Sequence, residues 1–400
     1  MTQLPRWRLT AALILTGLTM RIAVTSVGSV LNRIQDSLHA SSTSVGVLTT
    51  LPVLVFAVFG SLTPRWAERF GAFRVLVAGL LISTLGMITR ALVTSLWAFL
   101  LLSVLALVGA SVTNVVLPGT VKRYFPNELG RMTAVYSTAL AVGATAAAGL
   151  TVPLGSWIGG PSDDRWRFGS AVWAALVVLA IVPWLAMLRP DPDAKSAVRA
   201  PAISARTMLR SRTAKMLVLF FGFQSMQAYI SFGWYAKFLH DHGMSNAAAG
   251  GLVALYSGVS IPVSMIVPRV PQQRHRFVLI FLAVCWGSAY AAFGAAPTTT
   301  PWLWMILAGL GSGSFPLILA LFAMRSRTPE VTTSLSAVAQ AGGYLMAGTG
   351  PLLFGVLHGV TNGWAAPLAL LWVSLIAATV TGWYCCTPHM VDDELAASAA

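Results

Sequence analysis

Long apolar runs recur along almost the whole chain, and they constrain its fold more than any other feature. Twelve runs are bounded by charges, prolines or polar turns, and each reaches the length of about 20 residues that a helix needs to cross a bilayer. Hydrophobic residues make up 56% of the chain and charged residues 10%, which excludes a water-soluble globule. The sequence therefore predicts an all-α integral membrane protein with twelve transmembrane helices in a lipid bilayer. The predicted spans cover residues 9–31, 43–63, 75–95, 97–120, 131–154, 167–188, 214–238, 245–267, 277–296, 301–324, 331–359 and 364–386.

A single long connection divides these runs into two sets of six. Residues 189–213 are polar, basic and contain prolines, a composition typical of a linker. We therefore predict an N-terminal six-helix bundle at 1–188, a cytoplasmic linker at 189–213, a C-terminal six-helix bundle at 214–388 and a cytoplasmic tail at 389–400.

Basic residues are concentrated on one side of the predicted topology. If the N-terminus is cytoplasmic, 20 of the 26 Lys and Arg residues fall on the cytoplasmic side. Arg21 falls within the membrane, and the remaining five fall on the outer side. The positive-inside rule then predicts that both termini are cytoplasmic. Topology thus accounts for the net charge of +14, and no nucleic-acid partner is expected. The five outer residues are Arg33, Arg90, Arg165, Arg167 and Lys237.

The sequence shows no pattern of catalytic or cofactor-binding residues. Its three cysteines, Cys285, Cys385 and Cys386, form neither a CxxC pair nor a Cys/His spacing suited to zinc. The closely spaced glycines at 309–313 lie inside a predicted span and not between a strand and a helix, which argues against nucleotide binding. We therefore expect no metal and no cofactor, and we predict that the chain is not an enzyme.

The two halves of the chain correspond to each other in sequence. Pro64 follows the second predicted span as Pro268 follows the eighth, at an offset of 204 residues. Lys122 and Arg325 end the fourth and tenth spans in the same way, at an offset of 203 residues. Matching cytoplasmic loops indicate two six-helix parallel repeats, an organisation found in transporters whose substrate site lies near the midplane between the halves.

One arginine, Arg21, lies near the middle of the first predicted span. It is about 12 residues, or about 18 Å of helix, from the basic residues on either side, which is too deep for snorkelling. A charge at this depth costs about 2.5–3.5 kcal/mol on insertion scales. The repeat offset of 203 residues places Gln224 of the seventh span at the equivalent position. We expect these two side chains to face one central cavity.

Several longer motifs resemble those of a known family. They are "RIAVTSVGSVL", "GSLTPRWAERFGAFR", "NVVLPGTVKRYFP", "GRMTAVYSTAL", "FFGFQS", "GLGSGSFPLILAL" and "AQAGGYLMAGTGPLLFGVLHGVTNGW". Together they cover most of both halves and make the chain resemble the major facilitator superfamily, and within it the cyanate and 2-nitroimidazole transporter family. The resemblance implies secondary transport of a small solute across a bacterial-type inner membrane.

The same resemblance assigns a conformational role to a loop between the second and third spans. Residues 60–74 resemble the superfamily's loop of glycines flanking acidic and basic residues, with Pro64 where an aspartate is usual. The residues that the resemblance carries over are Gly60, Arg65, Arg69, Gly71 and Arg74.

Carboxylates are absent from the predicted spans. All 12 Asp and Glu residues fall in predicted loops or tails, whereas a transporter of cationic drugs, or one with a carboxylate proton relay, would place such a group within the membrane. The positive charge of Arg21 therefore favours a small anionic or weakly acidic solute, which the guanidinium fork would bind. Transport would proceed by uniport, by exchange, or by symport in which the proton travels with the substrate.

Other polar and aromatic side chains are candidates for the same substrate-binding site. Thr25 follows Arg21 by one helical turn, and Gln227 follows Gln224 in the same way. The remaining candidates are Asn114, Tyr136, Tyr229, Gln340 and Tyr344. Each polar group is explained equally well by a hydrogen bond between helices, and the aromatic rings by packing. His358, close to the outer end of its span, fits an interface residue better than a proton carrier.

Two alternatives to anion transport stay open. The first is efflux of neutral planar compounds, in which tryptophan-rich and methionine-rich walls would matter more than Arg21. The second is a membrane-embedded sensor or enzyme, which would need a catalytic constellation or a soluble domain that the sequence does not provide. We expect a monomer in each case.

Overall fold

The regular structure of the chain is helical. The computed structural model describes residues 6–39, 42–157, 165–188 and 203–397, and this part of the chain contains no β-strand. Eleven of its helical segments are long and apolar enough to cross a membrane. The remaining predicted span corresponds to α16 (Pro329–Thr361), which has 33 residues but is interrupted by glycine, serine and threonine. The predicted all-α membrane fold is confirmed.

The helices group into two compact units. The first unit comprises residues 1–120 and 135–202, and the second comprises residues 121–134 and 203–400. The end of the fourth span and the start of the fifth thus group with the second unit. Residues 189–202 of the predicted linker lie outside the described residues. The rest of that linker includes the short helix α10 (Ala205–Met208) and the beginning of α11 (Arg212–Asp241).

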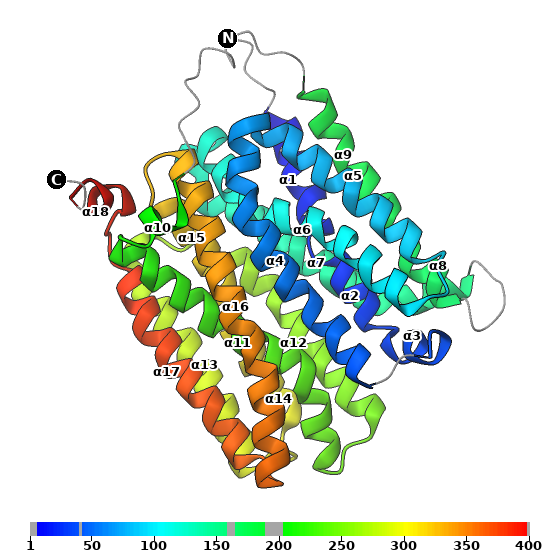
Figure 1. Cartoon of the computed structure of the whole chain (residues 1–400). Coiled ribbons are helices and arrows are strands. Elements are labelled where there is room, and N and C mark those ends of the chain that lie inside the picture. The colour runs from blue at the N-terminus through cyan, green and yellow to red at the C-terminus, as the bar shows by residue number, and fades with distance from the viewer. Residues whose placement is uncertain (1–5, 40–41, 158–164, 189–202, 398–400) are drawn as a thin grey trace. The chain divides into compact units, whose positions relative to one another are not determined.

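The first unit carries the first six predicted spans. Its helices are α1 (Arg6–Thr19), α2 (Ile22–Gly28), α3 (Leu31–Ser37), α4 (Ser42–Phe70), α5 (Ala72–Arg90), α6 (Leu96–Tyr124), α7 (Leu129–Trp157), α8 (Arg165–Ala171) and α9 (Ala174–Ala186) (Figure 1). The first span is divided into α1 and α2 by a turn at residues 20–21. The sixth is divided in the same manner into α8 and α9.

The second unit carries the other six spans. Besides α10 and α16, its helices are α11 (Arg212–Asp241), α12 (Asn246–Ile266), α13 (His275–Ala295), α14 (Pro301–Gly311), α15 (Ser314–Met324), α17 (Ala365–Cys385) and α18 (Val391–Ala397). Three short 3-10 turns, η1 (Pro126–Glu128), η4 (Val267–Arg269) and η5 (Gln272–Arg274), also belong to this unit. The most extensive packing within it is between α11 and α16.

Large apolar side chains are exposed in stripes along several helices. On α5 they recur at Leu81, Leu85 and Ile88, and on α17 at Val373, Ile376 and Val380. This spacing of three or four residues places each set on one helical face. Exposed faces of this kind would be unfavourable in water but match the hydrocarbon of a bilayer, in agreement with the predicted membrane location.

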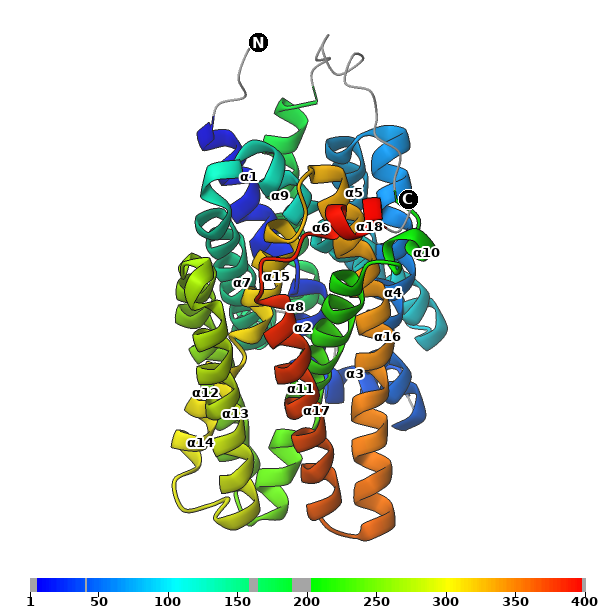
Figure 2. The same ribbon diagram turned by 90° about the vertical axis from the view of Figure 1, so that its left-hand side faces the viewer.

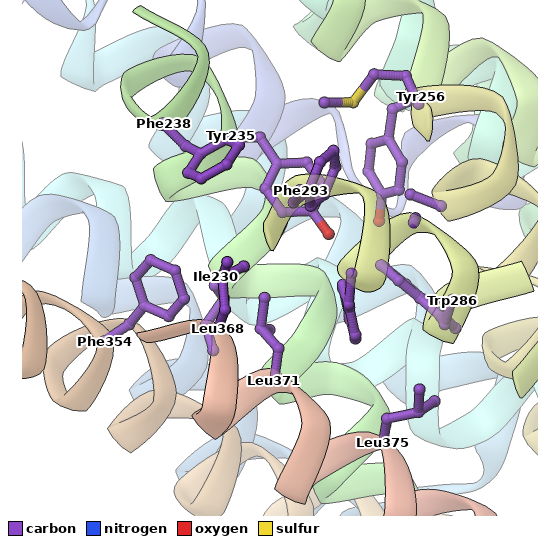
Figure 3. Close-up of a cluster of buried hydrophobic side chains, with 14 of the residues drawn as sticks. Ile230, Tyr235, Phe238, Tyr256, Trp286, Phe293, Phe354, Leu368, Leu371 and Leu375 are labelled. Carbon is purple, nitrogen blue, oxygen red and sulfur yellow. The ribbon is translucent and has the colours of Figure 1, made fainter. Parts of the chain in front are cut away.

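An aromatic cluster forms the core of the second unit, and Figure 3 shows its side chains. The rings of Tyr235 and Phe293 lie together with their centroids 5.2 Å apart, and those of Tyr235 and Tyr256 are 5.8 Å apart. Tilted and edge-to-face pairs at these distances are favourable beyond their apolar burial. They join α11 to α12 and α13.

The segment at residues 60–74, predicted as a loop, is mostly helix. α4 continues through Pro64 to Phe70, and α5 begins at Ala72, so Gly71 alone connects the two helices. Proline is tolerated within membrane helices where neighbouring groups satisfy the freed backbone, which explains why the predicted boundary is wrong. Gly71 has a φ of +89°, a backbone conformation that favours glycine.

The C-terminal helix α18 folds back onto the second unit. It lies beside α10 at the start of α11 (Figure 2). The Glu394 carboxylate accepts hydrogen bonds from Ser211 Oγ at 2.6 Å, Thr213 N at 2.9 Å and Thr213 Oγ1 at 2.7 Å. Burial alone would raise the pKa of Glu394, but these hydrogen bonds outweigh it and lower the pKa. The acidic tail therefore caps the N-terminus of α11.

Candidate substrate-binding site

Arg21 lies at the break in the first membrane span. It precedes α2 as the N-cap residue, with φ −116° and ψ −9° and no capping hydrogen bond from its side chain. Its carbonyl oxygen accepts hydrogen bonds from the backbone N–H groups of Val24 and Thr25, both at 3.0 Å. The structure thus places the mid-span arginine at the start of a new helical segment, directly after the turn that ends α1.

The Arg21 guanidinium lies over an aromatic ring of α4. Its Cζ atom is 5.9 Å from the ring centroid of Phe56, near the outer limit for a cation–π interaction. Phe56 is buried, whereas Arg21 is partly exposed. Thr25 donates its hydroxyl to the Arg21 carbonyl oxygen at 3.1 Å. Sequence reasoning did not identify Phe56, because its spacing in α4 is that of any packed apolar residue.

A second arginine contacts the same short helix. Arg90, at the end of α5, was predicted to lie on the outer side, at the end of the span 75–95, and it is only 1% exposed. Its Nη1 atom donates to Ala23 O at 3.1 Å, and its Nη2 atom donates to Ser26 Oγ at 3.4 Å. Both acceptors belong to α2, and they hold the guanidinium in its buried position. The only available sequence signal was an arginine that directly ends an apolar run.

Two glutamines of the candidate site lie on α11 in the second unit. Gln224 and Gln227 are each 2% exposed. Gln227 Oε1 accepts the Tyr290 hydroxyl at 2.9 Å, and Gln227 Nε2 donates to Phe223 O at 3.3 Å. Gln224 Oε1 accepts a longer hydrogen bond of 3.4 Å from Ser225. The amide of Gln227 thus joins α11 to α13.

Aromatic members of the predicted site gather around Tyr344 of α16. Its ring makes edge-to-face contacts with Phe221, at a centroid distance of 4.9 Å, and with Tyr229, at 6.3 Å. Tyr344 is 1% exposed, and Tyr229 is partly exposed. The structure therefore brings together two of the predicted residues and adds Phe221, which sequence reasoning did not single out.

The remaining polar candidates are held largely by their own helices. Asn114 Nδ2 donates to Ala110 O at 2.9 Å on α6, and Gln340 Nε2 donates to Ser336 Oγ at 2.7 Å on α16. Tyr136 is 1% exposed on α7. Its backbone oxygen would lie 2.7 Å from a Cβ atom added to Gly17, so α1 and α7 pack closely there. These residues stay predictions for the substrate-binding site.

The residues carried over to the conformational segment occupy two helices and the glycine between them. Gly60, Arg65 and Arg69 lie on α4, and Arg74 lies in the first turn of α5. A Cβ atom on Gly60 would make ordinary contacts of 3.5 Å with Ser111 and Val115 of α6. The segment is thus a corner between two helices, and its conformational role stays a prediction.

The repeat-related basic residues have matching backbone partners. Lys122 Nζ donates to Ala323 O of α15 at 3.2 Å, and Arg325 Nε donates to Cys385 O of α17 at 2.8 Å. Each cation thus binds a carbonyl near the C-terminal end of a helix, where the helix dipole favours positive charge. The adjacent Arg123 and Glu330 form an ion pair of 3.5 Å.

Neither the clusters of ionisable side chains nor the hollow described below indicates a second binding site. Within the described ranges, no group of three His, Cys, Asp or Glu residues is arranged to hold a metal ion. A hollow of about 710 Å³ lies between residues 127–131 and residues 268–272 of the second unit. No predicted substrate-binding residue lines it. His358 stacks on Trp364 at 4.0 Å and has its Nε2 atom 3.9 Å from an oxygen of Asp241.

Comparison with known proteins identifies the group of transporters to which the sequence is similar. A family model described as Major Facilitator Superfamily matches residues 13–351. The 2-nitroimidazole transporter of Escherichia coli is 30% identical over 367 residues, with 90% of each chain covered. The cyanate transport protein CynX of Escherichia coli is 28% identical over 353 residues, covering 88% of this chain and 90% of the relative.

A solved structure extends the comparison to the fold. The proton:xylose symporter XylE bound to 6-bromo-6-deoxy-D-glucose matches with a TM-score of 0.77 over 98% of both chains, at 13% sequence identity. At this identity the likeness concerns the fold alone, and the proton coupling and the sugar belong to that protein. The fold likeness agrees with the twelve-helix architecture predicted from the sequence.

Proposed function

The chain belongs to the major facilitator superfamily, and on that premise we propose that it transports a small anionic or weakly acidic solute, cyanate-like or nitroimidazole-like, by alternating access. Arg21 binds the negative charge of that solute. The observation that carries this proposal is the position of Arg21: a partly exposed guanidinium at a helix break within a membrane span.

The electrostatic argument rests on the composition of the spans. The chain has 12 acidic residues against 26 basic ones, and no acidic residue lies in the middle of a predicted span. A guanidinium stays charged at any physiological pH and presents paired donors that match carboxylate-like or delocalised anions. A small anion that reaches Arg21 from water would therefore gain a strong, charge-assisted interaction in a region of low dielectric.

The relatives support the same solute class. One is named for cyanate and the other for 2-nitroimidazole; the first is a small linear anion, and the second is a small flat heterocycle with a weakly acidic N–H group. Arg21 belongs to the segment "RIAVTSVGSVL" on which the family resemblance partly rests. The prediction that Gln224 shares the site concerns residues of two separate units and stays a prediction.

Location and assembly form part of the proposal. The distribution of Lys and Arg along the sequence supports an inner-membrane protein with both termini in the cytoplasm. We place α18 and its acidic residues on that side. The protein acts as a monomer, because the two six-helix repeats of one chain together form a complete transport path.

A neutral planar compound is the second candidate substrate. The observation in its favour is the ring cluster of Phe221, Tyr229 and Tyr344 in the second unit. Offset or edge-to-face contacts with such rings would hold a flat heterocycle without a charge. This substrate class would make transport depend on the aromatic cluster and leave it insensitive to Arg21.

Uptake into proteoliposomes distinguishes the two candidates. We expect Arg21→Ala to reduce the uptake of cyanate and of other small anions by roughly tenfold or more, the loss of about one charge-assisted hydrogen-bonded contact. Arg21→Lys should fall in between, because it keeps the charge but loses the fork. Arg33→Ala, which removes an exposed arginine of α3, serves as the control. Equal anion uptake by the Arg21→Ala and Arg33→Ala proteins would refute the proposal.

A further inference from the structure

Arg90 is the most deeply buried cation among the described residues of the first unit, and transport of a solute at Arg21 leaves it without a role. Its side chain is 1% exposed, and Ser26, one of its two acceptors, is 0% exposed. The third donor atom of the guanidinium, Nε, is buried without a hydrogen-bond partner among the described residues. No described carboxylate lies within ion-pair distance of Arg90.

Both acceptors of Arg90 belong to α2, the seven-residue helix that starts directly after Arg21. Ala23 and Ser26 are three residues apart, a spacing that places them on the same helical face. Ala23 lies two residues after Arg21 and Ser26 five residues after it. The guanidinium fork therefore fixes both the rotation of α2 about its axis and its position along α5.

Besides its hydrogen bonds to Arg90, α2 is restrained by packing, since it also contacts α8. It is separated from α1 by the turn at residues 20–21, and no side chain caps its N-terminus. The Arg21 side chain itself lies over Phe56 of α4, and α4 packs against α5. Three neighbouring helices thus contact this segment: α4 at the Arg21 guanidinium, α5 at the backbone that carries it, and α8 against α2 itself.

We propose that Arg90 is a positioning residue that fixes α2 on α5 and thereby sets the direction of the Arg21 side chain toward its solute. A buried guanidinium cannot lose its proton, so any displacement of α2 would leave the charge without its acceptors, at a high desolvation cost. This inference rests on the proposed function of Arg21.

Transport kinetics provide the first test. Full-length protein in proteoliposomes is compared with Arg90→Lys, Ser26→Ala and the control Arg167→Lys, with cyanate and 2-nitroimidazole as probes. Arg167 belongs to the same unit and also donates to backbone oxygens, and these, on Ala91 and Val93, lie just after α5. We expect KM to rise roughly fivefold in Arg90→Lys and roughly twofold in Ser26→Ala, with the maximal rate nearly unchanged, because only solute binding is weakened.

A label on α2 provides a test that does not depend on the solute. Gly28 is exposed, and a Cβ atom there would meet nothing within 4 Å. Gly28→Cys with a nitroxide label, in a chain whose three buried cysteines are replaced by alanine, reports the mobility of α2. Both Arg90→Lys and Ser26→Ala should increase that mobility, and Arg167→Lys should leave it unchanged.

The two tests separate this inference from the proposed function. If Arg21 variants transport both probes normally while the label becomes mobile in Arg90→Lys, the proposed solute site fails and the positioning of α2 by Arg90 holds. If Arg21 variants lose anion affinity while Arg90→Lys and Ser26→Ala alter neither KM nor label mobility, the inference is overturned. A fall in maximal rate alone, at unchanged KM and label mobility, would also overturn it, because it would indicate a general structural role.

Discussion

The first and seventh spans occupy equivalent positions in the two repeats, yet their backbones differ. The first is divided into α1, of 14 residues, and α2, of seven. The seventh is the continuous helix α11, of 30 residues, with Ser211 as its N-cap and Glu394 accepting hydrogen bonds at its start. Arg21 lies at the break, whereas its repeat equivalent Gln224 lies inside the uninterrupted helix.

The contrast shows that positions matched by the repeat offset can differ in backbone conformation. A neutral amide meets its hydrogen-bonding needs from close neighbours, as Gln227 does with Phe223 and Tyr290. A guanidinium has five donors and a permanent charge, so neighbouring groups must stabilise the charge and accept its hydrogen bonds. Near Arg21 these include the Phe56 ring and the α2 segment that Arg90 binds.

A substitution in the closely packed region next to the break between α1 and α2 is expected to have the largest effect on stability. A Cβ atom on Gly143 of α7 would lie 1.9 Å from Leu18 O, a backbone atom of α1. On Gly222 of α11 the nearest atom would be the flexible Met346 Cε, at 2.0 Å. Gly143→Ala should therefore destabilise the protein by about 1–3 kcal/mol, and Gly222→Ala by less, because methionine can rotate away. Thermal unfolding in detergent measures both. An equal loss in the two variants would show that the first span is no more tightly constrained than the seventh.

Removing the Glu394 cap on α11 is expected to have a smaller effect on stability, and one that depends on pH. The pKa of Glu394 is lowered below its ordinary value of 4.5, so its contribution to stability is fully present above that value and is lost as the pH falls through the folded-state pKa. Glu394→Gln should lower stability at neutral pH by about 0.5–1 kcal/mol. Its deficit relative to wild type should shrink on acidification. Asp393→Asn, which breaks only an exposed ion pair with Arg327, is the control and should change little. A deficit of constant size at every pH would show that the charge of Glu394 is not what stabilises α11.

The hydrogen bond that joins α11 to α13 is expected to give the smallest effect. Tyr290→Phe removes the donor to Gln227 Oε1 and should cost about 0.6 kcal/mol, the average for a polar contact between membrane helices. Ser374→Ala removes the 3.0 Å hydrogen bond from α17 to Phe223 O and should give a loss of similar size. KM for cyanate should stay unchanged in both. A marked change of KM in Tyr290→Phe alone would instead indicate that Gln227 contacts the solute.

The outcome at individual residues shows where sequence reasoning holds and where it stops. The positions of the membrane spans and the membership of the superfamily follow from apolar runs and motifs, which are properties of short stretches. The helical course of residues 60–70 did not follow, because the tolerance of Pro64 depends on neighbouring groups. Arg90 shows the same limit. Its acceptor at Ala23 is 67 residues away in the chain, and no local pattern indicates that pairing.

The sequence by itself determined that this chain crosses a membrane many times, that its halves correspond, and that one arginine lies at mid-span. These properties depend on the free energy of transferring each segment from water to lipid, which each segment carries by itself. The tertiary structure alone decided where the first span breaks, that Phe56 lies beside Arg21, and that Arg90 is buried against α2. Those features depend on which donors and acceptors packing brings together, and segments distant in sequence supply them.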